Sequence, residues 1–154
     1  MGLWTRVRDL TAGPQRRILH DLTAAYHDEK RMARQLRADA ERVPYPNLAD
    51  ALLGLAAEED THAARLQQQL ERLGGATGEA DVGMRRAGRN YWERLAITLE
   101  ALRAKSKRYR ELAQHWDLDD AVSGALFGEL ANEDAAMCRV VGDLIARSDP
   151  HALD

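Results

Sequence analysis

Residues 55–66 read LAAEEDTHAARL, and this stretch combines a helical pattern with ionisable groups at inward positions. Leucine stands at both ends, and Glu59 and His62 fall between them on alternating steps of three and four residues. Side chains at this spacing share one face of an amphipathic helix. The same spacing continues over residues 48–73. We therefore predict a helix over 48–73 whose buried face carries Glu59 and His62 near its middle.

Three further helical segments accompany this one. Ala, Leu, Arg, Glu and Gln fill them, and no stretch alternates as a half-buried strand does. Pro14 opens the first segment, and Gly74 and Gly75 form a helix-ending signal after the second. The predicted helices cover residues about 15–43, 48–73, 90–116 and 120–147. The chain is thus expected to be all-α, a single domain over residues 1–154.

The connections between the segments predict the topology. The breaks at 44–47 and 117–120 are short, so each joins an antiparallel helical hairpin. The connection over 74–89 has 16 residues. Extended, it reaches about 53 Å, whereas a helix of about 27 residues is about 40 Å long. It can therefore cross the full length of the bundle. A four-helix bundle of two hairpins with one long crossover has ferritin-like connectivity.

Inward faces can be assigned to the other three helices by the same spacing. In the first helix the line is Leu19, Leu22, Tyr26, Glu29, Ala33, Leu36, Ala40 and Val43. In the third it is Trp92, Leu95, Leu99, Leu102, Ser106, Tyr109, Ala113 and Trp116. In the fourth it is Phe127, Leu130, Asp134, Met137, Val141 and Leu144. Two more carboxylates, Glu29 and Asp134, are therefore predicted to point inward at mid-helix.

Buried carboxylates need an explanation, because an ionised group without a partner loses many kcal/mol of hydration. Residues three apart share a helical face, so Glu59 and His62 can reach one ion. Three carboxylates and one imidazole suit iron, manganese or zinc. The candidate metal ligands are Glu29, Glu59, His62 and Asp134. The alternative is a buried hydrogen-bonded network of the same residues, with a protonated carboxyl among them and no metal.

The segment from Leu55 to Ala63 is similar to the LAxEExxHA signature of the ferritin-like superfamily, in particular of the rubrerythrin or bacterioferritin-type di-iron carboxylate proteins. Glu29 and the turn at 41–44 resemble the liganding glutamate and the turn of that family's first helix. The resemblance covers roughly residues 15–147. It implies a non-haem metal site, oxidation of ferrous iron or reduction of peroxide, and a tyrosine close to the metals, at Tyr109. Tyr109 is thus a candidate redox or hydrogen-bonding residue.

The resemblance also implies two equivalent halves, and the sequence contains the repeat. An offset of 73 maps Leu22, Tyr26, Glu29, Ala33, Leu36 and Ala40 onto Leu95, Leu99, Leu102, Ser106, Tyr109 and Ala113. An offset of 75 maps Glu59 and His62 onto Asp134 and Met137. The second half thus has Leu102 in place of a glutamate and Met137 in place of the histidine. In the family's arrangement, only one metal keeps four candidate ligands. The sequence therefore predicts a single iron or manganese ion, or none, and no haem.

Composition excludes several other functions. The net charge is −3, with 22 Lys and Arg against 25 Asp and Glu, so nothing points to nucleic acid. The mean hydropathy of −0.51 and the lack of a long apolar run argue against a membrane partner. One cysteine predicts a reducing, cytoplasmic location. We interpret the basic run of Arg103, Lys105, Lys107, Arg108 and Arg110 as a solvated helix face. A homodimer is expected.

Two hypotheses of function follow. The first is a ferritin-like non-haem metalloprotein that binds one iron or manganese ion at an incomplete di-iron-type site, with a ferroxidase or peroxide-related redox role. Whether such a protein is an enzyme stays open, because two-electron chemistry is easier with two metals. The second is a metal-free helical bundle that acts as an interaction or structural module. Metal analysis of the purified protein separates the two hypotheses.

Overall fold

The computed structural model describes residues 3–79, 83 and 88–148, with only the helical backbone described for residues 3–12. It contains four helices: α1 (Leu3–Ala40), α2 (Pro46–Arg72), α3 (Tyr91–Trp116) and α4 (Ala121–Ala146). No strand occurs among the described residues. The all-α prediction is confirmed, and the bounds of α2, α3 and α4 lie within two residues of the predicted ones.

Local sequence signals account for the helix ends. The side chains of Asn90 and Asp120 cap α3 and α4 by accepting hydrogen bonds from backbone N–H groups three residues on, at 2.9 and 3.0 Å. Pro46 stands in the first turn of α2, where its missing N–H is not needed. After α2, Gly74 adopts a φ of 78°, and the Gly75 N–H donates to the carbonyl of Leu70 at 2.8 Å. A left-handed glycine at this position ends a helix, as the sequence predicted.

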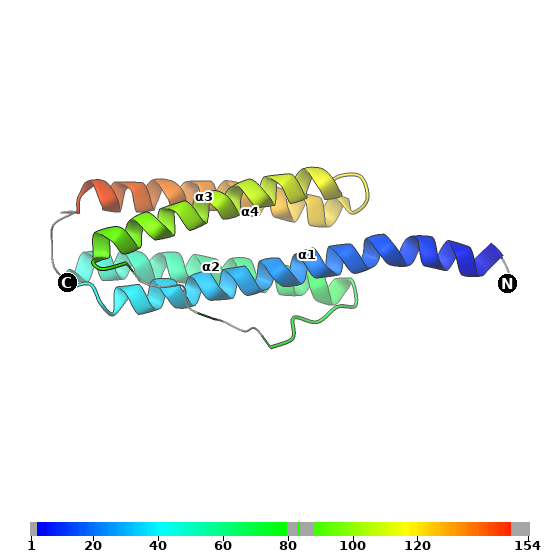
Figure 1. Ribbon diagram of the computed structural model, residues 1–154, viewed down its shortest axis with the longest axis horizontal. Coiled ribbons are helices and arrows are strands. Elements are labelled where there is room, and N and C mark those ends of the chain that lie inside the picture. The colour runs from blue at the N-terminus through cyan, green and yellow to red at the C-terminus, as the bar shows by residue number, and fades with distance from the viewer. Residues whose placement is uncertain (1–2, 80–82, 84–87, 149–154) are drawn as a thin grey trace.

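The helices pair as two antiparallel hairpins, α1 with α2 and α3 with α4 (Figure 1). Helix α3 starts at the same end of the bundle as α2 (Figure 1). The two hairpins then face each other, with α1 beside α3 and α2 beside α4. This is the predicted topology of two hairpins joined by a long crossover.

Helix α1 differs from the prediction at its N-terminal end. It begins at Leu3 rather than at about residue 15, and Pro14 lies inside it. A proline lacks the N–H that would bond to the carbonyl four residues earlier, here that of Leu10. The backbone hydrogen bonds before and after this missing one continue the helix. Pro14, which the sequence analysis interpreted as the start of the helix, therefore lies inside it. The extra turns of α1 project beyond the other helices (Figure 1).

The apolar core has two parts that lie on either side of a polar layer. One part contains Leu36, Ala40, Leu48, Leu52, Leu55, Ala56, Tyr91, Leu95, Leu102, Met137 and Val141. The other contains Ile18, Leu22, Ala25, Leu66, Leu70, Tyr109, Trp116, Phe127, Leu130 and Ala131. Glu29, Glu59 and Asp134 fall between these two sets along their helices and are fully buried. The polar layer therefore crosses the middle of the bundle.

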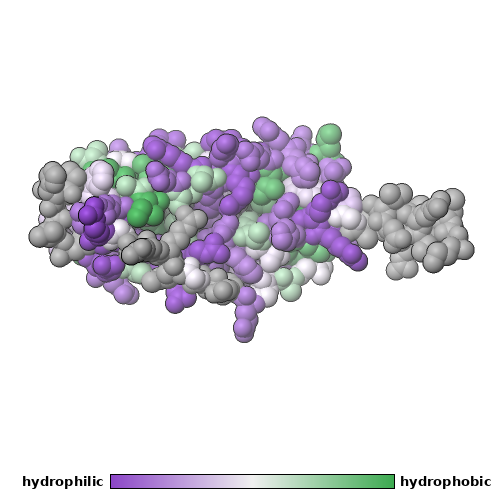
Figure 2. Space-filling view, viewed as in Figure 1, coloured by the Kyte–Doolittle hydropathy of each residue, from purple (hydrophilic) through white to green (hydrophobic). Residues whose placement is uncertain are grey.

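The outer surface is mainly hydrophilic on the face shown in Figure 2, where hydrophobic residues occur singly or in small groups. Trp116, the last residue of the predicted inward line of the third helix, is buried, and its indole N–H donates to Asp21 at 2.9 Å. Among the described residues, no helix has the length and apolar character needed to span a membrane.

Candidate metal centre

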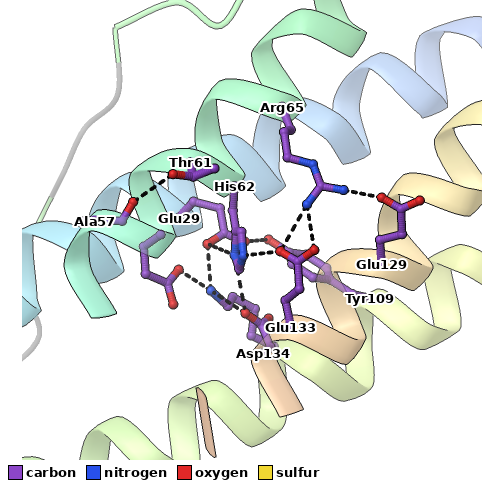
Figure 3. A network of polar contacts seen from close by, with 11 residues as sticks. Glu29, Ala57, Thr61, His62, Arg65, Tyr109, Glu129, Glu133 and Asp134 are labelled. Atoms are coloured by element: carbon purple, nitrogen blue, oxygen red, sulfur yellow. Dashed lines mark hydrogen bonds and ion pairs between the residues drawn. The ribbon is translucent and has the colours of Figure 1, made fainter. Parts of the chain in front are cut away.

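The four predicted ligands come together in the polar layer. Glu29 from α1, Glu59 and His62 from α2, and Asp134 from α4 each offer a ligand atom, and these atoms lie within 4.8 Å of one another. All four side chains are buried, with His62 exposed by 2% and the carboxylates by 0%. Glu29, His62 and Asp134 point toward one another in Figure 3. The inward spacing of each helix thus delivers these residues to one point.

The spread of these atoms is close to that of a coordination sphere. With ligand distances of about 2.1 Å, two ligands on opposite sides of an ion are about 4.2 Å apart. The His62 Nδ1 lies 3.6 Å from Glu29 Oε2 and 3.6 Å from Asp134 Oδ1. The four candidate atoms, within 4.8 Å of one another, are thus spaced slightly more widely than the ligands of one ion.

The structure adds a residue that the sequence interpretation placed elsewhere. Lys105, assigned to a solvated basic face, is 3% exposed and extends from α3 into the cluster. Its Nζ donates to Glu29 Oε2 at 2.7 Å and to Glu59 Oε2, and it lies 3.3 Å from Asp134 Oδ1. The assignment of Lys105 to solvent was wrong. Its neighbours Arg103, Lys107, Arg108 and Arg110 are exposed, as predicted.

A sequence signal for Lys105 did exist. The predicted inward line of α3 steps from Leu102 to Ser106 and then to Tyr109. Lys105 is three residues after Leu102 and four before Tyr109, so it fits the same alternation. Both Lys105 and Ser106 are in fact buried. Ser106 faces α4 and donates to the carbonyl of Ala131 at 2.9 Å, whereas Lys105 turns toward the carboxylates.

His62 is oriented by its second ring nitrogen. The Nε2 lies 2.8 Å from Glu133 Oε2, on the exposed rim of α4 (Figure 3). Arg65 donates to both oxygens of Glu133, at 2.9 and 3.0 Å, and also to Glu129. A carboxylate at one ring nitrogen favours the tautomer that carries the proton there and leaves the other nitrogen as a ligand. The Nδ1, which faces Glu29 and Asp134, is thus the ring nitrogen that could bind a metal.

Tyr109 closes the cluster from α3. Its hydroxyl donates to Glu29 Oε1 at 2.6 Å, and its side chain is fully buried. Burial and the neighbouring charge of Glu29 raise the pKa of Tyr109 well above its ordinary value, so it stays a neutral phenol. The hydrogen-bonding role considered for this residue is present. The hydroxyl of Tyr109 holds the Glu29 carboxylate in place.

The pKa values of the two buried glutamates shift in opposite directions. Burial raises the pKa of Glu59 well above the usual range, and its hydrogen bond with Glu29 raises it further. Burial also acts to raise the pKa of Glu29, but hydrogen bonding from Glu59 and the charge of Lys105 outweigh it and lower that pKa. Glu29 is therefore the ionised member and Glu59 the protonated one.

The pKa values of Asp134 and His62 are both raised. Burial raises the pKa of Asp134 to about 7, against the opposing charge of Lys105. Burial acts to lower the pKa of His62, but its contact with the Glu29 carboxylate has the larger combined effect and raises that pKa. The carboxylates likewise hold the pKa of Lys105 above its ordinary value despite burial, so Lys105 remains an ammonium.

Several buried polar atoms of the cluster lack a hydrogen-bond partner among the described residues. They are Glu59 Oε1, His62 Nδ1 and both carboxylate oxygens of Asp134. Buried polar atoms without partners are uncommon and costly. All of these atoms are lone-pair donors that belong to the predicted ligand set, which is the donor chemistry of a divalent metal. The residues present therefore fit one metal ion.

The positions that the repeat pairs with Glu29 and His62 are apolar. Leu102 and Met137, which occupy the positions of a second glutamate and histidine, are buried in the core cluster that also contains Leu36 and Leu55. Neither offers an oxygen or nitrogen ligand. The ammonium of Lys105, in contact with three carboxylates, is the positive charge that this structure provides beside the single candidate metal position.

Comparison with known proteins adds no assignment: the chain matches no protein-family model and no curated protein.

Proposed function

We propose that this protein is a mononuclear metal-binding four-helix bundle, with Glu29, Glu59, His62 and Asp134 as the ligands. The observation that carries the proposal is the set of unpartnered buried atoms on Glu59, His62 and Asp134, all of which can coordinate one ion. A hydrogen-bonded network that evolved without a metal would leave fewer such atoms unpaired.

The charge of the cluster supports a divalent ion. Three ionised carboxylates and the Lys105 ammonium carry a net charge of minus two in a buried layer. Either two protons or one divalent cation neutralises it. The raised pKa values of Glu59 and Asp134 show that the metal-free cluster retains protons instead. A bound ion would displace these protons and restore all three carboxylates as ligands.

Iron or manganese is the proposed ion, since oxygen ligands with one imidazole suit both. Either would supply a one-electron redox couple to a ferroxidase or peroxide-related reaction. Around it, Tyr109 would hold Glu29 in place, and Glu133 would fix the ring of His62. Lys105 would keep one positive charge beside the ion, in contact with three of its ligands. The buried layer would exclude bulk water from the ion.

One observation favours a second candidate function, a metal-free interaction module. Lys105 already pairs with Glu29 and Glu59 and lies near Asp134, so the carboxylates have a cation without any metal. On this reading the cluster is a buried ion-pair network that fixes the register of the four helices.

Metal analysis distinguishes the two candidates. Protein purified without chelator should contain close to one equivalent of iron or manganese, or should take up one equivalent of Mn(II), or of Fe(II) under anaerobic conditions. Less than about 0.2 equivalents of any transition metal, unchanged by this reconstitution, would contradict the metal site and leave the metal-free module.

Affinity for Mn(II) should rise with pH. A metal must displace the proton of Asp134, whose pKa is about 7, and that of Glu59. The Kd should therefore fall by up to about 1,000-fold between pH 6 and pH 8, with about tenfold from Asp134 as pH passes its pKa and up to about tenfold per pH unit from Glu59. Isothermal titration at several pH values measures this, and a Kd that does not vary with pH would contradict it.

The stability of the metal-free protein should change in the opposite direction. Since folding raises the pKa of Asp134 from 3.8 to about 7, its contribution to stability is complete below about pH 4 and is lost as pH rises through about 7. The gain in Tm on adding saturating Mn(II) should consequently be larger at pH 8 than at pH 6.

Replacing Glu133 by glutamine should weaken Mn(II) binding roughly tenfold, because the contact that orients the His62 ring loses its charge. Glu129→Gln is the matched control. Glu129 also binds Arg65 on the rim of α4, but its contact is with Arg65 and not with the histidine. Equal affinities of the two variants would show that Glu133 does not tune the site.

A further inference from the structure

The candidate ligands are enclosed within the bundle, so an ion has to pass between helices to reach them. All four ligands are buried, and the two parts of the apolar core close the polar layer on both sides along the helix axes. Helices α1 and α2 pack closely along their length, as do α3 and α4, whereas the two hairpins contact each other much more loosely. Loosely packed parts of a protein open most easily. An ion would therefore enter between the hairpins, along either the α1–α3 seam or the α2–α4 seam.

The α1–α3 seam is unfavourable for a cation. A pocket of about 90 Å³ opens there, and Lys105 is one of its lining residues. The Lys105 ammonium donates to Glu29 and Glu59, so it stands where the pocket meets the carboxylates. A divalent ion on this path would meet the ammonium first, and like charges repel strongly in a buried site.

The α2–α4 seam instead has carboxylates on its rim. The side chains of Glu129 and Glu133 are 62% and 46% exposed, and Glu133 Oε2 lies 2.8 Å from His62 Nε2. The other ring nitrogen, Nδ1, faces Glu29 and Asp134 and is buried without a hydrogen-bond partner among the described residues. One imidazole ring thus separates an exposed carboxylate from the buried ligands (Figure 3). Negative charge at a surface raises the local concentration of cations, so this seam suits an incoming metal ion.

Arg65 closes the α2–α4 seam at this rim. From α2 it donates to both oxygens of Glu133, at 2.9 and 3.0 Å, and also to Glu129. The planar guanidinium is suited to holding carboxylates through two parallel hydrogen bonds. The pairing joins the two helices and keeps Glu133 against His62, whose side chain is only 3% exposed (Figure 3). While the pairing is intact, both rim carboxylates are engaged and His62 is covered.

We propose that the divalent ion enters and leaves along the α2–α4 seam, and that Arg65 is the gating residue that sets the rate of this exchange. Breaking its ion pairs frees Glu129 and Glu133 to bind the incoming ion and lets the seam widen beside His62. Ion pairs on exposed rims are weak, so these break readily without unfolding of the bundle. The inference rests on the proposed metal site and adds how that site is filled and emptied.

Gating by Arg65 has a distinct kinetic consequence. Since Arg65 is not one of the four candidate ligands, loss of its ion pairs lowers the barrier to entry and to exit alike and changes the bound state little. The association and release rates should therefore rise together, while the Kd stays nearly constant. A tenfold rise corresponds to about 1.4 kcal/mol in the barrier. Three hydrogen bonds to exposed carboxylates are of this size.

The test measures release of Mn(II) from the loaded full chain into an excess of a chelator that changes colour on binding Mn(II). Arg65→Gln should raise the release rate at least about tenfold, with a Kd within about threefold of the wild-type value by calorimetric titration. Arg65→Lys keeps the charge but loses the planar fork, so it should also release Mn(II) several times faster. A wild-type rate in Arg65→Lys would show that only the charge matters and would overturn the gating role.

Two variants serve as controls. Arg72→Gln changes an exposed arginine about two turns further along α2, and Ala101→Leu narrows the α1–α3 pocket. Both should leave the release rate unchanged. A wild-type rate in Arg65→Gln, or release slowed about tenfold by Ala101→Leu, would overturn the inference while the metal site itself stands. Wild-type protein that binds no Mn(II) at equilibrium would contradict the proposed metal site and, with it, the inference.

Discussion

Replacing Lys105 by methionine should lower the free energy of unfolding of the metal-free protein by about 3–5 kcal/mol at pH 8. The ammonium is the cation that contacts Glu29, Glu59 and Asp134, all of which are fully buried. Removing one partner of a buried ion pair leaves charge uncompensated, which costs more than the pair itself contributes. Methionine keeps an unbranched side chain of similar length, so the loss of packing is small.

The same variant should bind Mn(II) more tightly, by at least about tenfold. A fixed ammonium within a few ångströms of the ion repels it in a buried layer, where charges are poorly screened. Lys105→Met removes that repulsion and leaves all four ligands in place. The two effects therefore have opposite signs. The substitution makes the metal-free protein less stable, and it increases the stability that the protein gains on binding Mn(II).

Lys107→Met is the matched control, because the Lys107 side chain is 78% exposed on the same helix. It should change neither the stability of the protein nor its affinity for Mn(II). The cost of Lys105→Met should also shrink at pH 5, because this pH lies below the pKa of about 7 of Asp134, which is then protonated. Chemical denaturation at pH 5 and pH 8 measures this. Stability unchanged at pH 8 would contradict the pairing of Lys105 with the carboxylates.

The double variant Glu59→Ala, His62→Ala should lower Mn(II) affinity by more than about 100-fold. Removing a group that only orients a ligand costs 10- to 100-fold, and here two of the four candidate ligands are lost. Metal content after reconstitution should fall below about 0.2 equivalents. If the metal remained bound with wild-type affinity, it would have to lie elsewhere in the protein.

Two variants control for the loss of buried side chains. Glu58→Ala changes the neighbouring carboxylate, which is exposed, and should bind metal normally. Glu59→Gln keeps the volume of the side chain and removes its charge, so it should weaken metal binding while the fold is retained. Circular dichroism and thermal unfolding establish that each variant is folded before its metal affinity is measured.

The bundle itself was predictable because its signals are local. The apolar spacing of each segment, the two glycines after α2 and the length of the crossover specify helices and connections without reference to distant residues. The spacing also placed Glu29, Glu59, His62 and Asp134 on buried faces, since a helix presents residues three and four apart on one side. The N-terminal end of α1 escaped prediction because Pro14 has the same signature at a helix start as in a tolerated interior position.

The partners of these buried groups were not predictable in the same way. The spacing of α3 allows either Lys105 or Ser106 between Leu102 and Tyr109, and only the rotation of α3 against α1 and α4 directs each to its own contact. A lysine within a run of basic residues is most simply interpreted as solvent-exposed. The sequence shows its charge, but it does not show that three carboxylates from other helices lie next to it. The contact of Glu133 with His62 likewise joins two helices, and the two residues are 71 positions apart in the sequence.

By itself, the sequence determined four helices, their order, and which carboxylates and which histidine face inward. These properties follow from periodicity along one chain. Only the tertiary structure decided the charge state of the polar layer, because that depends on which cation reaches three buried carboxylates from another helix. With Lys105 in place, three ionised carboxylates would leave two negative charges in the layer, which either two protons or one divalent cation can neutralise.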